Sequence, residues 1–158
     1  MNEKMNWKPR WKIEKYLNPE DKKNNRPYAV VEFDGNLLLS EGIGAMLNLL
    51  IGAAETTFAN ANAQLGVGNS AVATATSQTD LQGASTAWRA MEATYPIISG
   101  RTVTFKSSFG SDEGNFAWEE FSVRNGAAAD KNLNRRVTSK GTKASGETWD
   151  LTLTIIIT

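Results

Sequence analysis

The C-terminal segment of the chain alternates strictly between large apolar side chains and smaller polar ones. The apolar positions are Trp149, Leu151, Leu153, Ile155 and Ile157. Successive side chains of a strand point to opposite faces, so this pattern predicts a strand with one face in a core and a threonine-rich face outside it. Similar patterns from Arg101 to Phe109 and from Asn115 to Arg124, separated by a glycine-containing turn, predict two further strands.

The composition favours one globular domain and excludes several kinds of chemistry. The chain has 158 residues, 41% of them hydrophobic, and 17 basic residues balance 17 acidic ones. No overall field therefore favours nucleic acid or an anionic membrane. Because cysteine and histidine are absent, disulfides, the usual zinc sites, imidazole bases and Ser/His/Asp triads are excluded. We expect neither an enzyme nor a cofactor or metal site.

The first 28 residues differ from the remainder. Through Arg26 they contain eight basic and four acidic residues, with prolines at 9, 19 and 27. This composition argues against a compact core, but the aromatic content argues against an idle tail. The segment is interpreted as an extended N-terminal arm over residues 1–28 that becomes ordered on a partner. A disordered leader is the alternative.

The partner-binding residues predicted for this arm are apolar or basic. They are Trp7, Arg10, Trp11, Ile13, Tyr16 and Leu17. Large aromatic side chains often supply much of the binding energy of an interface. Arg135 and Arg136, on a short polar strand, are predicted to form intersubunit or surface ion pairs.

Residues 29–158 are predicted to form the domain proper, an antiparallel β-sandwich of jelly-roll or tulip-like type. One short helix near residues 41–51 carries an apolar stripe, Ile43, Met46, Leu47 and Leu50, that we expect to pack on one end or one face of the sheet. A helix that binds a partner is the alternative. The segment from Ala63 to Gly68 reads as a strand whose two glycines permit close approach of neighbours. Residues 69–84 read as a long surface loop, and residues 85–95 as either a helical turn or an edge strand.

Within residues 29–158 the only adjacent carboxylates are Asp112-Glu113 and Glu119-Glu120. Neighbouring residues on a strand point to opposite faces, so Glu119 and Glu120 cannot form a catalytic dyad unless a bulge redirects one of them. The alternative for this strand is burial of both its faces. Asp112 and Glu113 lack the ligand pattern of a calcium loop and are interpreted as solvated turn charges.

Several ordered segments resemble a family of small structural proteins of tailed bacteriophages. They are LLLSEGIGAMLNLLIG (residues 37–52), AQLGVGNSAVATATSQTDLQG (63–83), AMEATYPIISGRTVTFKSSFGSDEGNFAWEEFSVRNG (90–126), LNRRV (133–137) and GTKASGETWDLTLTIIIT (141–158). The resemblance covers residues 37–158. It implies a β-sandwich that assembles into oligomers, commonly trimers, on a virus particle, and it implies no catalytic residues.

Two functions are compatible with this resemblance. The first is a capsid decoration (cement) protein, made in the host cytoplasm, that trimerises on the capsid exterior and binds the major capsid protein and copies of itself. It would stabilise the shell through its N-terminal arm. The second is a tail fibre, tip or tail-ornament protein that binds a host glycan through the loops 69–84 and 125–132. A small hydrolase, which would depend on carboxylates alone, is disfavoured. Neither nucleic acid nor a membrane is an expected partner.

Overall fold

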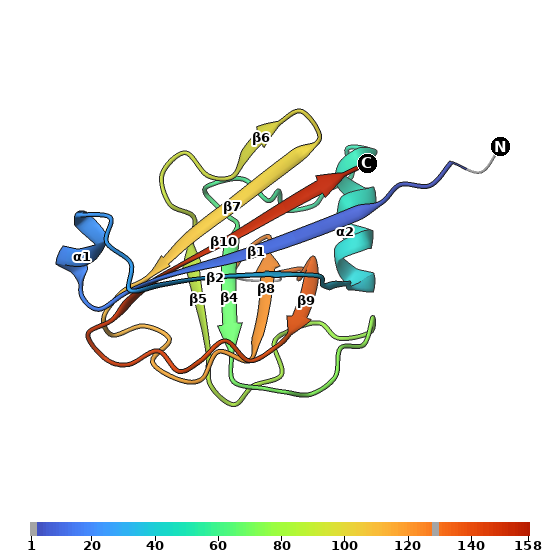
Figure 1. Ribbon diagram of the computed structural model, residues 1–158. Coiled ribbons are helices and arrows are strands. Elements are labelled where there is room, and N and C mark those ends of the chain that lie inside the picture. The colour runs from blue at the N-terminus through green and yellow to red at the C-terminus, as the bar shows by residue number, and fades with distance from the viewer. Residues whose placement is uncertain (1–2, 128–129) are drawn as a thin grey trace.

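The computed structural model describes residues 3–127 and 130–158 and consists of two five-stranded antiparallel sheets and two short helices (Figure 1). The first sheet has the order β2 (Ala29–Asp34), β1 (Trp7–Tyr16), β10 (Thr148–Ile157), β7 (Thr102–Phe109) and β6 (Ile97–Ser99). The second has the order β3 (Leu37–Leu38), β9 (Asn134–Val137), β8 (Glu120–Arg124), β4 (Gln64–Gly68) and β5 (Thr86–Ala90). The helices are α1 (Pro19–Lys23) and α2 (Ser40–Leu50). The predicted mainly β, sandwich-like architecture with a short helix is confirmed.

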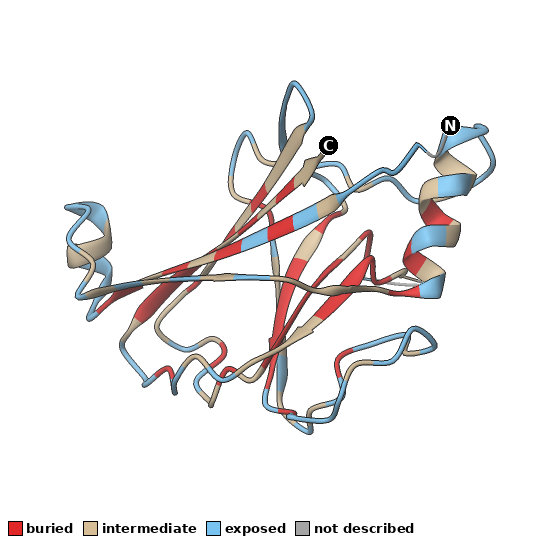
Figure 2. Ribbon diagram, turned by 45° about the vertical axis from the view of Figure 1, so that its right-hand side comes forward, coloured by how far each residue is buried: buried red, intermediate tan, exposed pale blue. Residues whose placement is uncertain are grey.

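The core lies between the two sheets, where the buried residues of Figure 2 gather along the facing strands. Trp118, in the segment before β8, is fully buried and meets Trp149 of β10 with ring centroids 4.9 Å apart. Phe109 lies at the same centroid distance from Trp118. Edge-to-face aromatic contacts of this kind add to the free energy of burial. The alternation from Trp149 to Ile157 therefore places one row of side chains in the core, as predicted.

The prediction of an N-terminal arm separate from the sandwich is not confirmed, because most of that segment belongs to the first sheet. All of β1 pairs with β10, from Trp7 opposite Ile157 to Tyr16 opposite Thr148, and β2 pairs along its other side. From Trp7 to Glu14 the odd-numbered positions of β1 are apolar and the even-numbered positions are charged, with Trp11 and Ile13 fully buried. The many charges that suggested an arm are thus the outer face of a central strand.

The strand β4 confirms the role expected of its glycines. A Cβ atom at Gly66 would overlap the Trp88 ring on β5, and one at Gly68 would overlap the Glu120 side chain on β8. Both neighbouring strands can therefore bring large side chains over β4. The undecided segment 85–95 contains an edge strand, β5, and both faces of β8 are buried.

The helix α2 occupies the predicted place but packs through a different face. Its buried residues are Gly42 and Ala45. A Cβ at Gly42 would overlap the backbone of Asn132 and Leu133, so the absence of a side chain lets the helix lie directly on the neighbouring chain. Of the predicted stripe, only Met46 packs against the core, whereas Ile43, Leu47 and Leu50 are exposed.

Candidate binding surfaces

The predicted partner-binding residues of the N-terminal segment do not lie on one surface. Trp11, Ile13 and Tyr16 are at most 3% exposed and Trp7 packs against the core, so these side chains stabilise the sandwich itself. Arg10 is exposed on the opposite face of β1, and Leu17 is exposed beyond its end. Of this group, only Arg10 and Leu17 have surface positions suited to a partner.

Arg135 is not a surface residue. Its guanidinium is fully buried and pairs with Glu120, also fully buried, with Nη2 2.7 Å and Nε 2.8 Å from Oε2. Its Nη1 donates to the carbonyl of Val72 at 2.9 Å and to Oε1 of Gln78 at 3.0 Å. Glu120 in turn accepts from the backbone N–H groups of residues 82 and 83. This pair therefore fastens the long loop 69–84 to β8 and β9, and the prediction of an exposed pair at Arg135 is wrong. Arg136 is half-buried.

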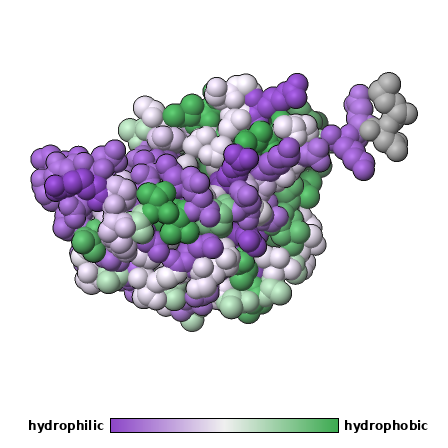
Figure 3. All heavy atoms as spheres, in the orientation of Figure 1, coloured by the Kyte–Doolittle hydropathy of each residue, from purple (hydrophilic) through white to green (hydrophobic). Residues whose placement is uncertain are grey.

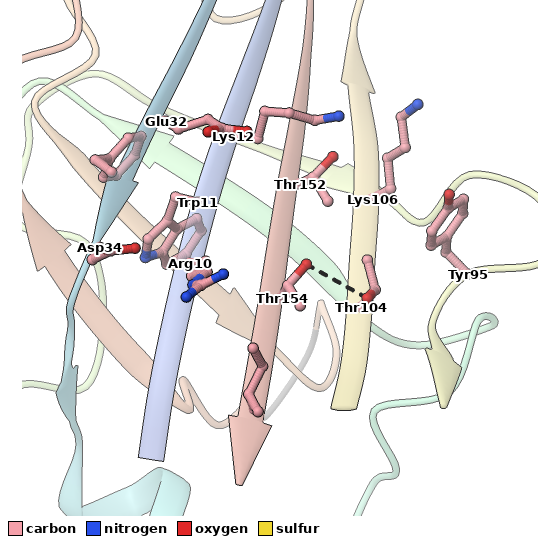
Figure 4. A pocket seen from close by; sticks show the side chains of 12 residues that line it. Arg10, Trp11, Lys12, Glu32, Asp34, Tyr95, Thr104, Lys106, Thr152 and Thr154 are labelled. Carbon is pink, nitrogen blue, oxygen red and sulfur yellow. Dashed lines mark hydrogen bonds between the residues drawn. The ribbon is translucent and has the colours of Figure 1, made fainter. Parts of the chain in front are cut away.

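A groove of approximately 620 Å³ lies on the outer face of the first sheet (Figure 4). Strand register places its lining in two rows across the sheet. One row runs Glu32, Lys12, Thr152, Lys106, and the next runs Asp34, Arg10, Thr154, Thr104. The centre of the groove is thus a strip of threonine hydroxyls on β10, with basic side chains on the strands to either side and carboxylates on β2.

The basic side chains of the groove, Arg10, Lys12 and Lys106, differ in how far their charges are already neutralised. Lys12 pairs with Glu14 at 3.0 Å. Burial by itself would raise the pKa of Glu14, but the hydrogen bond from Lys12 and the charges of Lys12 and Lys106 lower it below its usual value. Lys106 reaches Asp150 only at 3.7 Å, and no carboxylate of the described residues lies within 4.0 Å of the Arg10 guanidinium. The Arg10 charge is therefore available to a ligand.

One end of the outer face is closed by an ion-pair cluster around Lys22 of α1. Its ammonium lies 2.8 Å from Asp150, which is 2% exposed, and 2.9 Å from Glu92. Burial opposes the charge on Lys22, but hydrogen bonds to Asp150 and Glu92 raise its pKa above the usual value. This cluster holds α1 against the sheet and satisfies the buried Asp150 charge.

A second candidate surface is the apolar face of α2, defined by Ile43, Leu47 and Leu50 together with Ile51, the C-cap residue of the helix. These side chains are 40%, 56%, 80% and 78% exposed, respectively. Their spacing of four, three and one residues places them along one side of the helix. In Figure 3 hydrophobic residues gather along the right-hand side of the molecule, where Figure 1 places α2.

The helix that carries this apolar face is firmly attached at its N-terminal end. The Leu39 N–H donates to the carbonyl of Leu133 at 3.0 Å, and Oε1 of Glu41 accepts from the backbone N–H of Asn132 at 2.7 Å. Burial raises the pKa of Glu41, against the effect of that hydrogen bond. Because the helix is anchored in this way, the apolar face is preorganised for a partner.

The carboxylate clusters show no catalytic geometry. Glu120 belongs to the buried pair with Arg135, and Glu119 accepts a hydrogen bond from Ser139 at 2.9 Å. Glu113 pairs with Arg89 and accepts from the backbone N–H of Gly110, so the reading of Glu113 as a solvated turn charge is too simple. Within residues 3–127 and 130–158, no group of three or more acidic side chains is gathered to hold a metal ion. None of the helices in that same part of the chain has the length and hydropathy needed to cross a bilayer.

Sequence reasoning missed most of the groove, because its residues are far apart in the chain. Of its lining residues, Arg10 and Trp11 were predicted to bind a partner, whereas Lys12, Tyr95, Lys106, Thr152 and Thr154 were not. The available signal was the charged and threonine positions that alternate with apolar ones in all four strands. Using it requires knowing which strands are neighbours, which the alternation alone does not give.

Comparison with known proteins yields no match: no family model, no curated protein and no solved structure is similar to this chain.

Proposed function

We propose that this chain is a structural protein of a tailed-bacteriophage virion, a decoration protein that attaches to the capsid exterior through the apolar face of α2. The observation that carries the proposal is the exposure of four large aliphatic side chains on an anchored helix. The resemblance of residues 37–158 to phage structural proteins supports it. A contiguous apolar patch on a protein surface commonly marks a binding site for another macromolecule.

The chemistry of α2 supports a protein surface as the occupant. No charged residue occurs between Glu41 and Glu55, so the segment that carries the face is itself uncharged. A neutral apolar face gains free energy by burial, on the order of 1.5–3 kcal/mol for each side chain fully removed from water. We therefore assign it to an apolar, uncharged patch on the major capsid protein. Attachment of an oligomer by several such faces would strengthen binding by avidity.

This assignment replaces the N-terminal arm as the capsid-binding element. With Trp11, Ile13 and Tyr16 in the core, they are not free to cross between capsid subunits. Assembly into a homotrimer remains part of the proposal, on the basis of the resemblance. Light scattering of the purified protein measures the molar mass and tests this directly.

The attachment test is co-sedimentation with empty shells of the phage that encodes the chain. Leu47→Lys/Leu50→Lys should abolish binding, because two charges would have to be desolvated in the contact. Val30→Lys, at a position 52% exposed on β2, is the matched control and should bind like wild type. Both variants should keep the wild-type melting temperature, since all three positions are exposed.

Wild-type occupancy of the double variant on shells would overturn the assignment of α2. A change from oligomer to monomer in the same variant would also overturn it, because α2 would then join copies of the chain. The alternative location on a tail is distinguished by copy number. Many copies over the head favour a decoration protein, whereas a few at the tail favour a fibre or tip protein.

A further inference from the structure

The groove on the outer face of the first sheet has the features of a site for a small polar ligand. Its volume of approximately 620 Å³ lies within the range of small-molecule sites, roughly 300–1,000 Å³. The groove is separate from the apolar face of α2, with which it shares no lining residue. The proposed attachment to a capsid therefore leaves this groove without a role.

The arrangement of charge limits the class of ligand. Arg10, Lys12 and Lys106 are accompanied by Glu32 and Asp34, so the lining has only a small excess of positive charge. A polyanion such as nucleic acid would meet two carboxylates in the groove, which disfavours it. A ligand with one negative charge would be attracted to Arg10 and Lys106, which flank β10.

The uncharged part of the lining is suited to hydroxyl groups. Thr152 and Thr154 present hydroxyls along the centre of the groove, and Oγ1 of Thr154 lies 3.5 Å from Oγ1 of Thr104 (Figure 4). A hydroxyl both donates and accepts hydrogen bonds, while the carboxylates of Glu32 and Asp34 only accept. Such a mixture complements the hydroxyls of a sugar.

An aromatic ring forms the wall of the groove beyond β7. Tyr95 is half-buried, and its backbone carbonyl accepts a hydrogen bond from Asn60 at 2.6 Å. The preceding residue, Thr94, has φ of 74°, a left-handed conformation that is unfavourable for a β-branched residue. Strain at a residue next to a ligand-facing side chain is a recurrent feature of binding sites. In this protein the strained residue, Thr94, precedes Tyr95, whose ring lies at the edge of the hydroxyl-lined groove.

We propose that this groove binds an oligosaccharide that carries a single carboxylate. The carboxylate would lie between Arg10 and Lys106, the sugar hydroxyls would bond to Thr152, Thr154 and the acids of β2, and one apolar sugar face would cover the Tyr95 ring. The proposal does not depend on the function of α2.

The test is a titration of the full-length ¹⁵N-labelled protein, followed by NMR, with defined probes. The acidic probes are 3′-sialyllactose and a disaccharide that ends in glucuronic acid, and lactose is the neutral comparison. At least one of the acidic probes should shift the amide signals of Arg10, Thr152 and Thr154, and the shifts should saturate at millimolar probe concentrations. Lactose should bind about tenfold more weakly, because it lacks the charge-assisted hydrogen bonds.

Variants on one strand separate a built site from general attraction to a basic surface. Arg10→Gln should weaken binding of the acidic probe about tenfold. Lys8→Gln is the control, since Lys8 is exposed on the same face of β1 but does not line the groove. Both positions are exposed, so both variants should fold, as their melting temperatures will show.

Four results would overturn the proposal. The first is the absence of saturable shifts with both acidic probes, and the second is equal binding of lactose. The third is an equal loss in Lys8→Gln and Arg10→Gln, which would indicate non-specific attraction. A single-stranded oligonucleotide that binds more tightly than either acidic probe, with a steep dependence on salt, would likewise replace the saccharide by nucleic acid.

Discussion

Trp118 joins both sheets through its aromatic contacts. Its ring meets Phe109 of β7, Phe121 of β8 and Trp149 of β10, and its Nε1 donates to the carbonyl of Gly114 at 2.9 Å. The residue is fully buried. Trp118→Ala should therefore lower the free energy of unfolding by roughly 3–5 kcal/mol. Denaturant unfolding measures this loss. Tyr28→Ala is the control, because Tyr28 is 47% exposed. A similar, small loss in both variants would contradict the core position of Trp118.

The adjacent arginines Arg135 and Arg136 allow a matched comparison. Arg135→Met leaves the fully buried Glu120 without its partner, and removal of one member of a buried pair costs about 3–5 kcal/mol. Arg136→Met should cost less than about 1 kcal/mol, because Arg136 forms no ion pair among the described residues. Chemical denaturation of the two variants tests this difference. Equal losses would mean that the buried pair does not hold the loop 69–84.

Tyr16 makes stability sensitive to alkaline pH. Its burial, together with the charge and hydrogen-bond acceptor of Glu14, raises its pKa from 10.0 to about 12. The folded protein thus holds this proton more tightly than the unfolded chain. The resulting stabilisation is complete below pH 10 and is lost as the pH rises toward about 12.

The measurement is urea unfolding at several pH values from neutral to strongly alkaline. Tyr16→Phe has no proton to lose at this position, so its stability should fall less steeply above the ordinary tyrosine pKa, which is near 10. The slopes are compared rather than the absolute stabilities, because the substitution also removes the hydrogen bond to Glu14. Equal slopes would contradict a raised pKa at Tyr16.

Strand β1 limits how far the chain can be shortened from its N-terminus. It lies between β2 and β10 and contributes Trp11 and Ile13 to the core. Deletion of residues 2–16 should therefore prevent folding, since it leaves the backbone edges of β2 and β10 unpaired and uncovers the core. Circular dichroism and thermal melting test this. Deletion of residues 2–4, which precede the strand, is the control and should preserve the melting transition. A cooperative transition after the longer deletion would restore the hypothesis of a separate arm.

The strands with one apolar and one polar face were the most accessible to prediction. Trp149 to Ile157 shows this clearly, because the side-chain period of a strand is directly visible in its sequence. In β1 the same alternation was present, but the prolines and the number of charges outweighed it. The face by which α2 packs could not be predicted from hydropathy, because Gly42 contributes the absence of a side chain rather than apolar area. The groove depends on register across β2, β1, β10 and β7, which is a property of the assembled sheet.

Taken as one body, the molecule presents two chemically different surfaces. The apolar face of α2 lies at the opposite end of the molecule from α1, while the groove lies on the outer face of the first sheet (Figure 1). A protein attached by α2 could keep the groove open to solvent. The two proposals are therefore compatible, and each can fail without the other.

Electron cryo-microscopy of virions assembled with this protein tests the proposed attachment to a capsid through α2. We expect density for the sandwich in many symmetric copies on the head, with Leu47 and Leu50 of α2 seated against an apolar patch of the major capsid protein. Density with α2 facing solvent, or no copy of the sandwich on the capsid, would contradict it.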